Sequence, residues 1–147
     1  MFGFWNVRGL NDPIKIREVR RLINANDLCL VGLFETRVRE TNRLKVQRAL
    51  LSHWKFYAAT AANTSGRIWL CWDPSRCTVD ILDVAEQWIH CAVQFVKPAV
   101  GMRISFVYGS NDAITRRQLW KFITTTAAVS TFLPWCIRGD LNTVRWC

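Results

Sequence analysis

Polar side chains stand at the ends of four apolar, strand-like segments of this sequence. They are Asn6, Glu35, Tyr108 followed by Asn111, and Asp140 followed by Asn142. Side chains alternate along an extended backbone, so Asp140 and Asn142 should point to the same side. An acid and an amide at the carboxyl end of a strand stand where open α/β sheets usually bind their ligands. These side chains are therefore the candidate site residues.

The residue types in this set suit hydrolysis of a phosphodiester. The hard carboxylate oxygens of Glu35 suit Mg²⁺ or Mn²⁺ rather than zinc, and such an ion neutralises phosphate charge and polarises the scissile bond. Asp140, held by Asn142, could orient and deprotonate the attacking water. The hydroxyl of Tyr108 could hold a phosphate oxygen.

Each candidate also has an ordinary structural explanation. These are helix caps for Asn6 and Asn111, an ion pair with Arg37 or Arg39 for Glu35, a half-buried strand aromatic for Tyr108, and a turn for residues 139–142. Their joint occurrence at the ends of successive strands favours a common site.

The first third of the chain alternates strands with helices. The pattern predicts strands over residues 2–7 and 28–34, a helix from residue 13, and a helix over residues 41–51. Asn11 or Asp12 should cap the first helix. In the second helix we expect Leu44, Leu50 and Leu51 to lie on the inner side.

The middle of the chain reads as successive strands joined by turns. The predicted strands cover residues 54–60, 67–72, 77–84, 87–96 and 102–108, with turns at 61–66, 73–75 and 97–101. Such short connections imply antiparallel pairing. In the fourth strand, Ile89, Cys91, Val93 and Phe95 should share one face.

A third helix and a short buried strand complete the pattern. The helix should span residues 113–129, and the strand lies within residues 134–142. The helix residues expected to face inward are Leu119, Trp120, Phe122 and Ile123. Together the elements predict a mixed α/β sandwich with strands inside and helices outside.

Composition limits the class of protein. The chain has 147 residues, half of them apolar, which suits one domain with a real core. The net charge of +9 favours a polyanionic partner, with nucleic acid first and an anionic membrane second. Solubility alone could also account for that charge.

Cysteine usage and the amino terminus bear on the compartment. The six cysteines form no Cys-x-x-Cys pair and mostly lie in apolar runs, which favours buried free thiols in a reducing environment. The sequence shows neither a signal peptide nor an apolar run of membrane-spanning length. We expect an intracellular protein, nuclear or cytosolic, with no membrane partner.

Four motifs occur in an order that resembles a known superfamily. They are WNVRGL at residues 5–10, GLFETR at 32–37, VYGSN at 107–111 and GDLN at 139–142. Together they resemble the endonuclease/exonuclease/phosphatase superfamily, which has a DNase I-like fold. When GRIW at residues 66–69 and IHC at 89–91 are included, the sequence is most similar to the apurinic/apyrimidinic-type endonuclease domain of plant LINE-type (non-LTR) retrotransposons.

The resemblance implies a fold, a cofactor and a role for each residue. The fold is a four-layer α/β/β/α sandwich of two mixed sheets, of the α+β class. The roles are metal binding for Glu35 with Asn6, catalysis for Asp140, Asn142 and Tyr108, and substrate binding for Asn6 and Asn111. The implied cofactor is Mg²⁺ or Mn²⁺, and the implied partner is DNA.

Two departures from the superfamily pattern limit these expectations. Arg8 stands where the related repair enzymes often have an acid. The superfamily domain continues past its Gly-Asp-x-Asn motif to an Asp-His pair, whereas this chain ends at Cys147 and its only histidines are His53 and His90. We therefore expect residues 1–147 to be the amino-terminal two-thirds of the domain, a catalytically incomplete remnant that is monomeric or prone to aggregate.

Two other functions stay open. One is a basic module that binds nucleic acid without cutting it. The other is a phosphatase of the same superfamily, acting on a phosphoinositide or a nucleotide.

Overall fold

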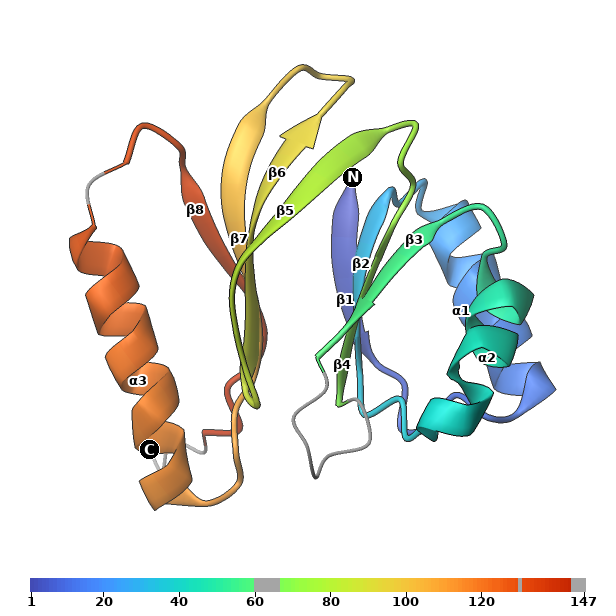
Figure 1. The fold of residues 1–147 in the computed structure, drawn as a ribbon, viewed down its shortest axis with the longest axis horizontal. Helices are drawn as coiled ribbons and strands as arrows, with labels where there is room; N and C mark the ends of the chain where they lie inside the picture. The colour runs from blue at the N-terminus through green and yellow to red at the C-terminus, as the bar shows by residue number, and fades with distance from the viewer. Residues whose placement is uncertain (60–66, 130, 144–147) are drawn as a thin grey trace.

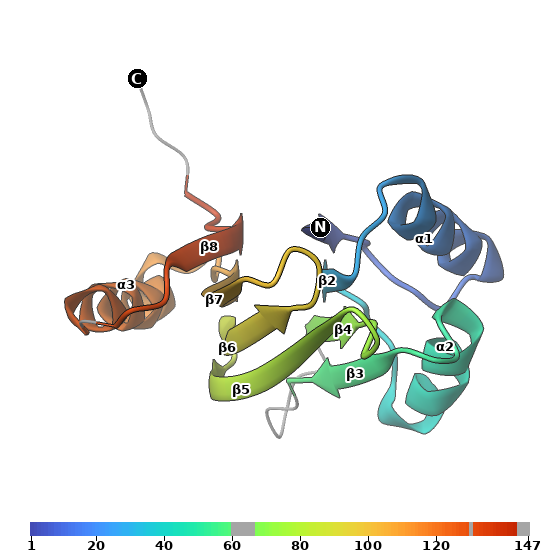
Figure 2. The ribbon, with the colours of Figure 1, turned by 90° about the horizontal axis from the view of Figure 1, so that it is seen from above.

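Two four-stranded sheets pack face to face between outer layers of helices. The computed structural model describes residues 1–59, 67–129 and 131–143. Helices α1 (Pro13–Ala25) and α2 (Arg43–Leu50) cover the outer face of one sheet, and α3 (Ala113–Ala128) lies on the outer face of the other (Figures 1 and 2). This arrangement confirms the predicted four-layer sandwich of two mixed sheets.

The first sheet has the strand order β1-β2-β4-β3. Its strands are β1 (Phe2–Asn6), β2 (Leu30–Phe34), β3 (Lys55–Ala58) and β4 (Ile68–Trp72). Strands β1 and β2 are parallel, and the other two pairs are antiparallel. The crossover from β1 to β2 is α1 (Pro13–Ala25), which begins where the Asp12 side chain accepts the N–H of Ile14 at 2.8 Å.

The second sheet has the order β5-β6-β7-β8. Its strands are β5 (Cys77–Ala85), β6 (Trp88–Phe95), β7 (Gly101–Tyr108) and β8 (Trp135–Asp140). The first three strands form an antiparallel meander, and β7 and β8 are parallel. The predicted antiparallel pairing along the middle strands thus holds within each sheet, but it is wrong for β4 and β5, which lie in different sheets. Helix α3 (Ala113–Ala128) makes the crossover from β7 to β8, and Asp112 caps it.

The inner core lies between the two sheets. Alternate residues of β6, among them Ile89, Cys91 and Val93, are buried there, which confirms the predicted alternation. Gly32 in β2 faces Phe106 in β7, and a Cβ added at Gly32 would lie 2.4 Å from the Phe106 ring. The sheets can approach this closely because position 32 has no side chain.

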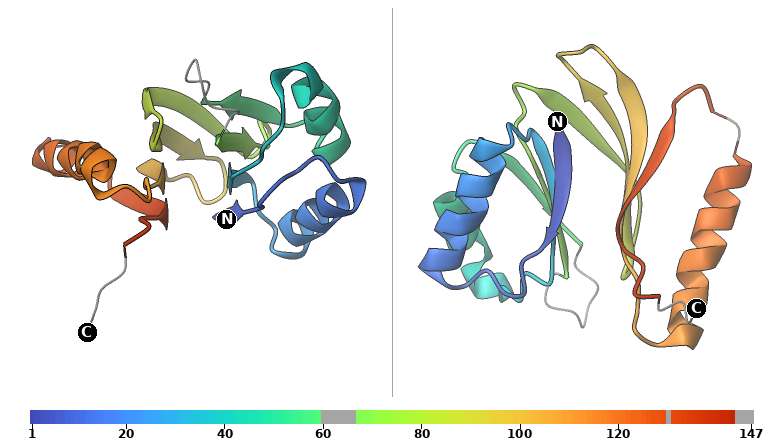
Figure 3. Two further views of the ribbon diagram at one scale, coloured as in Figure 1. Left: turned by 90° about the horizontal axis from the view of Figure 1, so that it is seen from below. Right: turned by 180° about the vertical axis from the view of Figure 1, so that it is seen from behind.

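The two outer cores differ in size. Between the first sheet and its helices lie thirteen buried residues, including Val19, Leu33 and Leu50. Between the second sheet and α3 lie three, namely Val107, Leu119 and Phe122. Helices α1 and α2 lie against the first sheet and α3 lies against the second, as the view from behind shows (Figure 3).

Two inward predictions are wrong. Leu44 is 59% exposed, because α2 (Arg43–Leu50) buries the stripe through Val46 and Leu50, which lies on another side of the helix. Trp120 is 39% exposed, because the buried stripe of α3 passes through Leu119 and Phe122. A short 3₁₀ helix (Glu40–Asn42) replaces the start of the second predicted helix.

The remaining structural expectations concern turns, thiols and membranes. The turn at residues 73–75 is present, with the Ser75 N–H donating to Asp73, whereas the one expected at 61–66 lies outside the described residues. Free thiols at positions 29, 71, 77 and 91 are buried, as predicted. In the described part of the chain, no helix is long and apolar enough to cross a membrane.

Candidate active site

The carboxyl ends of two parallel strand pairs meet at one edge of the sandwich, the lower edge in Figure 1. Asn6 ends β1 and Glu35 follows β2 in the first sheet. Tyr108 ends β7 and Asp140 ends β8 in the second. The two sheets therefore bring together four polar residues that lie far apart in the sequence.

Glu35 is the centre of the cluster. Its Oε1 accepts hydrogen bonds from the Asn6 amide at 3.0 Å and from the Tyr108 hydroxyl, and its Oε2 accepts one from Arg37 at 2.9 Å. The donors come from β1, β7 and the loop after β2, so the carboxylate is held from both sheets. The pairing with Arg37 was one of the ordinary explanations for Glu35, and it occurs together with the cluster.

These contacts set the protonation states. The hydrogen bond from Tyr108, with those from Asn6 and Arg37, holds the pKa of Glu35 below its usual value. Burial, together with the negative charge of Glu35, raises the pKa of Tyr108. At neutral pH, Glu35 is therefore an ionised carboxylate and Tyr108 is a protonated donor.

Asp140 and Asn142 lie beside Tyr108. Asp140 is the register partner of Tyr108 across the β7–β8 pair. The backbone N–H of Asn142 donates to Asp140 Oδ1 at 2.8 Å, and the Asn142 side chain donates to the Gly109 carbonyl at 2.6 Å. The backbone of Asn142 thus fixes the Asp140 carboxylate, while its amide ties the loop after β8 to the loop after β7.

The backbone around the site is strained. Arg8, Glu35, Arg37 and Asn142 have φ between 48° and 52°, and Asp27 is the fifth non-glycine residue with positive φ in the described ranges. Such left-handed conformations are unfavourable for side chains other than glycine, and they concentrate at functional sites. The Glu35 N–H donates to the Arg67 carbonyl at 2.7 Å, which helps to hold this conformation.

Gly139 positions the end of β8. Its φ is 142°, and a Cβ there would lie 1.8 Å from the Val107 carbonyl oxygen. A side chain at this position would therefore separate β8 from β7 and move Asp140 away from Tyr108.

A cavity of about 320 Å³ opens at the cluster. Its lining residues are Glu35, Arg37, Arg67, Tyr108, Gly109, Ser110 and Asn111. Asn111 lies in the loop between β7 and α3. Neither Asn6 nor Asn111 caps a helix, because the caps of α1 and α3 are Asp12 and Asp112. The two arginines make this polar cavity suitable for an anion next to the carboxylate.

Sequence reasoning missed two residues of the site. Arg67 lines the cavity and supplies the carbonyl that binds the Glu35 N–H, but a single arginine at the start of a strand gives no signal of this. Gln87 is 3% exposed and donates to the Thr115 carbonyl at 3.0 Å while accepting the Ser110 N–H at 2.8 Å. It fixes the loop that carries Asn111, and no sequence pattern marks it.

The donor set fits a hard divalent cation. Glu35 supplies carboxylate oxygens, and Asn6 carries an amide oxygen that accepts the Arg8 N–H at 3.2 Å. Mg²⁺ typically takes one or two carboxylates with water and substrate phosphates. In the described residues, no group of three or more His, Cys, Asp or Glu side chains gathers that could hold a metal ion, so water and substrate phosphates would have to complete the coordination. Of the predicted site residues, Glu35, Tyr108 and Asn111 line this cavity, whereas Asn6, Asp140 and Asn142 do not. Neither histidine, His53 or His90, lines it.

Comparison with known proteins identifies the fold. No family model and no curated protein sequence matches the chain. Among solved structures, D. rerio TDP2 complexed with a single-strand DNA product superposes with a TM-score of 0.74 at 12% identity, covering 98% of this chain and 61% of that one. The endonuclease domain of TRAS1, a telomere-specific non-LTR retrotransposon, gives 0.69 at 10% identity, covering 97% and 60%.

A third structure extends the likeness to a bacterial protein. An endonuclease/exonuclease/phosphatase family protein from Bacteroides thetaiotaomicron superposes with a TM-score of 0.66 at 11% identity, covering 96% of this chain and 62% of that one. The chain thus spans less than two thirds of the length of these structures. The chain has the DNase I-like fold that these structures share, which confirms the resemblance for the fold alone.

Proposed function

We propose that this chain is part of a metal-dependent phosphodiesterase domain that acts on DNA. The observation that carries the proposal is the hydrogen-bonded cluster of Asn6, Glu35 and Tyr108, with Asp140 and Asn142 beside it. These are the residue types that hydrolysis of a phosphodiester needs, and they meet at one edge of two sheets.

Each residue has a defined task in this proposal. Glu35 and Asn6 would hold Mg²⁺ or Mn²⁺, which when bound neutralises phosphate charge and polarises the scissile bond. Asn111 would bind a phosphate oxygen, and the Tyr108 hydroxyl would bind another by turning its one hydrogen from Glu35 to the phosphate. Asp140, fixed by the Asn142 backbone, accepts the proton of the attacking water.

DNA is the proposed substrate for two reasons. The net charge of +9 attracts a polyanion, and Arg37 and Arg67 bring positive charge to the cavity itself. The four ordered motifs, together with the fold shared with TRAS1, favour an origin as the endonuclease domain of a LINE-type retroelement.

We further propose that this chain alone hydrolyses DNA slowly. Among the described residues no imidazole reaches the cavity, so no histidine is placed there to transfer a proton to the leaving oxygen. Loss of a positioned proton-transfer group typically costs roughly 10²–10⁴ in rate.

Nicking of supercoiled plasmid in Mg²⁺ tests the activity. We expect nicking close to the background of protein-free plasmid, and Glu35→Ala, Asp140→Ala and the control Glu40→Ala should not exceed it. Rapid nicking abolished by the first two variants would show that the site is complete in this chain. Rapid nicking that survives both would contradict the site itself.

A salt titration tests DNA binding separately from cleavage. Affinity for a short duplex should fall with salt, with a log-log slope of about −0.9 per phosphate contacted. Binding that does not weaken with salt would show that the positive charge serves solubility. Salt-dependent binding unaffected by Arg37→Gln and Arg67→Gln would favour a binding surface elsewhere on the chain.

A further inference from the structure

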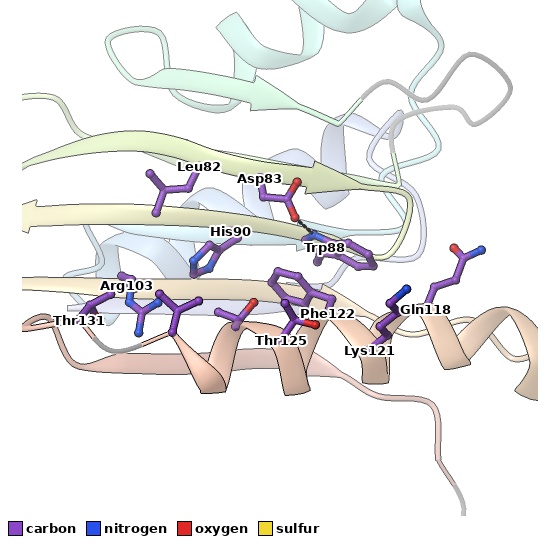
Figure 4. A pocket seen from close by; sticks show the side chains of 12 residues that line it. Leu82, Asp83, Trp88, His90, Arg103, Gln118, Lys121, Phe122, Thr125 and Thr131 are labelled. Carbon is purple, nitrogen blue, oxygen red and sulfur yellow. Dashed lines mark hydrogen bonds between the residues drawn. The ribbon is translucent and has the colours of Figure 1, made fainter.

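A second, larger cavity lies on the outer face of the second sheet. It has a volume of about 700 Å³ and lies between α3 and strands β5, β6 and β7 (Figure 4). The lining residues that matter here are Trp88, His90, Arg103, Lys121, Phe122 and Thr125. None of them lines the cavity at Glu35, and 700 Å³ is within the range of small-molecule sites.

One wall of this groove is formed by two aromatic rings that pack against each other. The rings of Trp88 and Phe122 stack with centroids 4.4 Å apart and planes 12° apart. The indole N–H of Trp88 donates to Asp83 at 2.9 Å, the bond drawn in Figure 4, which fixes the plane of the ring. A wall of this kind suits a planar apolar body.

His90 presents a hydrogen-bond donor to the groove. Its Nδ1 lies 2.7 Å from the hydroxyl of Ser105, a fully buried residue that also accepts the indole N–H of Trp135 at 2.9 Å. Among the described contacts, the Ser105 hydrogen has only His90 Nδ1 as its acceptor. Burial and Arg103 lower the pKa of His90, so the neutral ring carries its proton on Nε2.

Two cations complete the groove. In the described part of the chain, neither Arg103 nor Lys121 has an acid within ion-pair distance, and the buried Nε of Arg103 has no acceptor. Arg103 instead lies over the ring of Trp135, with 5.7 Å between the guanidinium carbon and the ring centroid. The single acid of the lining, Asp83, is already engaged by Trp88.

We propose that this groove binds a small aromatic anion, a planar ring that bears a carboxylate or a phosphate. The ring packs on the Trp88–Phe122 wall, and the anionic group takes the free donors of Arg103 and His90, which lie toward one end of the groove, whereas Lys121 lies toward the other end (Figure 4). The charge of the groove therefore complements the charge of its ligand. The site is separate from the phosphodiesterase cavity and does not depend on that proposal.

Calorimetric titration of the intact chain with three probes tests the chemistry. The probes are 2-naphthoate, 2-naphthyl phosphate and the uncharged 2-naphthamide. We expect saturable binding of at least one anion and much weaker binding of the amide, and the two anions distinguish a carboxylate site from a phosphate site. Absence of saturable binding by both anions, or equal affinity for the amide, would overturn the proposal.

Matched variants on α3 locate the binding. Thr125 lines the groove and its neighbour Thr124 does not, and both are exposed. Thr125→Trp should weaken binding by about tenfold or more because the indole fills the space the ring needs, whereas Thr124→Trp should leave it unchanged. Equal affinity in Thr125→Trp and the wild type would overturn the proposal.

A second pair of variants tests the charge. Arg103→Gln should weaken binding by about threefold, the size expected of one partly exposed ion pair. Arg117→Gln removes the same charge from a position on α3 outside the groove and should have no effect. Equal losses in both would show that net charge, and not the groove, attracts the anion.

Discussion

The two outer faces of the sandwich have the same architecture but not the same cover. On the first sheet, α1 and α2 enclose thirteen buried residues. On the second sheet, α3 encloses three and leaves a groove of about 700 Å³ beside them. The first outer face is therefore the more fully packed of the two, and the second holds the groove for which we propose a ligand.

The candidate active site joins these two halves. Asn6 and Glu35 come from the first sheet, and Tyr108, Asp140 and Asn142 come from the second. The hydrogen bond from the Tyr108 hydroxyl to Glu35 connects them, and the Tyr108 ring stacks on Phe34 of β2 with centroids 5.8 Å apart. The proposed metal ligands thus lie in the well-covered half, and the proposed phosphate and water contacts lie in the other.

The largest expected difference is between two leucines. Leu50 of α2 and Leu119 of α3 are both fully buried, one on each outer face. Leu50→Ala should cost about 3–5 kcal/mol and Leu119→Ala about 2–3 kcal/mol, because α3 can shift to close part of the void left on its less enclosed face. Urea denaturation measures both, and a larger loss for Leu119→Ala would contradict the comparison.

Removing the contact between the halves should have a smaller effect. Tyr108→Phe deletes a hydrogen bond to a carboxylate, and such bonds contribute about 1.5–3 kcal/mol. We expect a loss in this range from urea denaturation. Tyr57→Phe, in β3 and also beside the inner core, is the matched control and should cost less. Equal losses of unfolding free energy in the two variants would show that the hydrogen bond from Tyr108 to Glu35 does not stabilise the packing of the two sheets.

The smallest expected effect is on stability at acid pH. The donors to Glu35 lower its pKa, so they stabilise the folded state above the ordinary carboxyl pKa of about 4.3. That contribution is lost as the pH falls through the lowered pKa. The unfolding free energy of the wild type should therefore fall more between neutral and acid pH than that of Glu35→Gln. If the unfolding free energies of the two proteins changed with pH in parallel, the stabilising role of the hydrogen bonds to Glu35 would be contradicted.

The sequence predicted the strands well because their signals are local. Alternation in β6 and the continuous apolar run of β2 depend only on neighbouring residues. The wrong predictions at Leu44 and Trp120 concern which side of a helix faces the sheet. A shift of one or two residues along the helix is enough to change that side. A one-dimensional pattern locates this stripe poorly when apolar residues stand on more than one side.

The candidate site was predictable only in part for a similar reason. Asn6, Glu35 and Tyr108 could be found because each ends an apolar segment. Arg67 and Gln87 act through contacts with residues distant in the sequence, such as the Glu35 N–H on the Arg67 carbonyl. Such contacts arise when the strands pair into sheets, so the residue types alone do not reveal them.

Binding of Mn²⁺ tests the central claim, that the cluster around Glu35 forms a divalent-cation site, most directly. Titration of the intact chain with Mn²⁺, followed by electron paramagnetic resonance of the free ion, measures it without any need for catalysis. Glu35→Gln should lower the affinity for Mn²⁺ about tenfold or more, because the substitution removes the charged ligand. Glu40→Gln, an exposed acid paired with Arg43, should bind as the wild type does. Equal Mn²⁺ affinity in Glu35→Gln and the wild type would contradict the account.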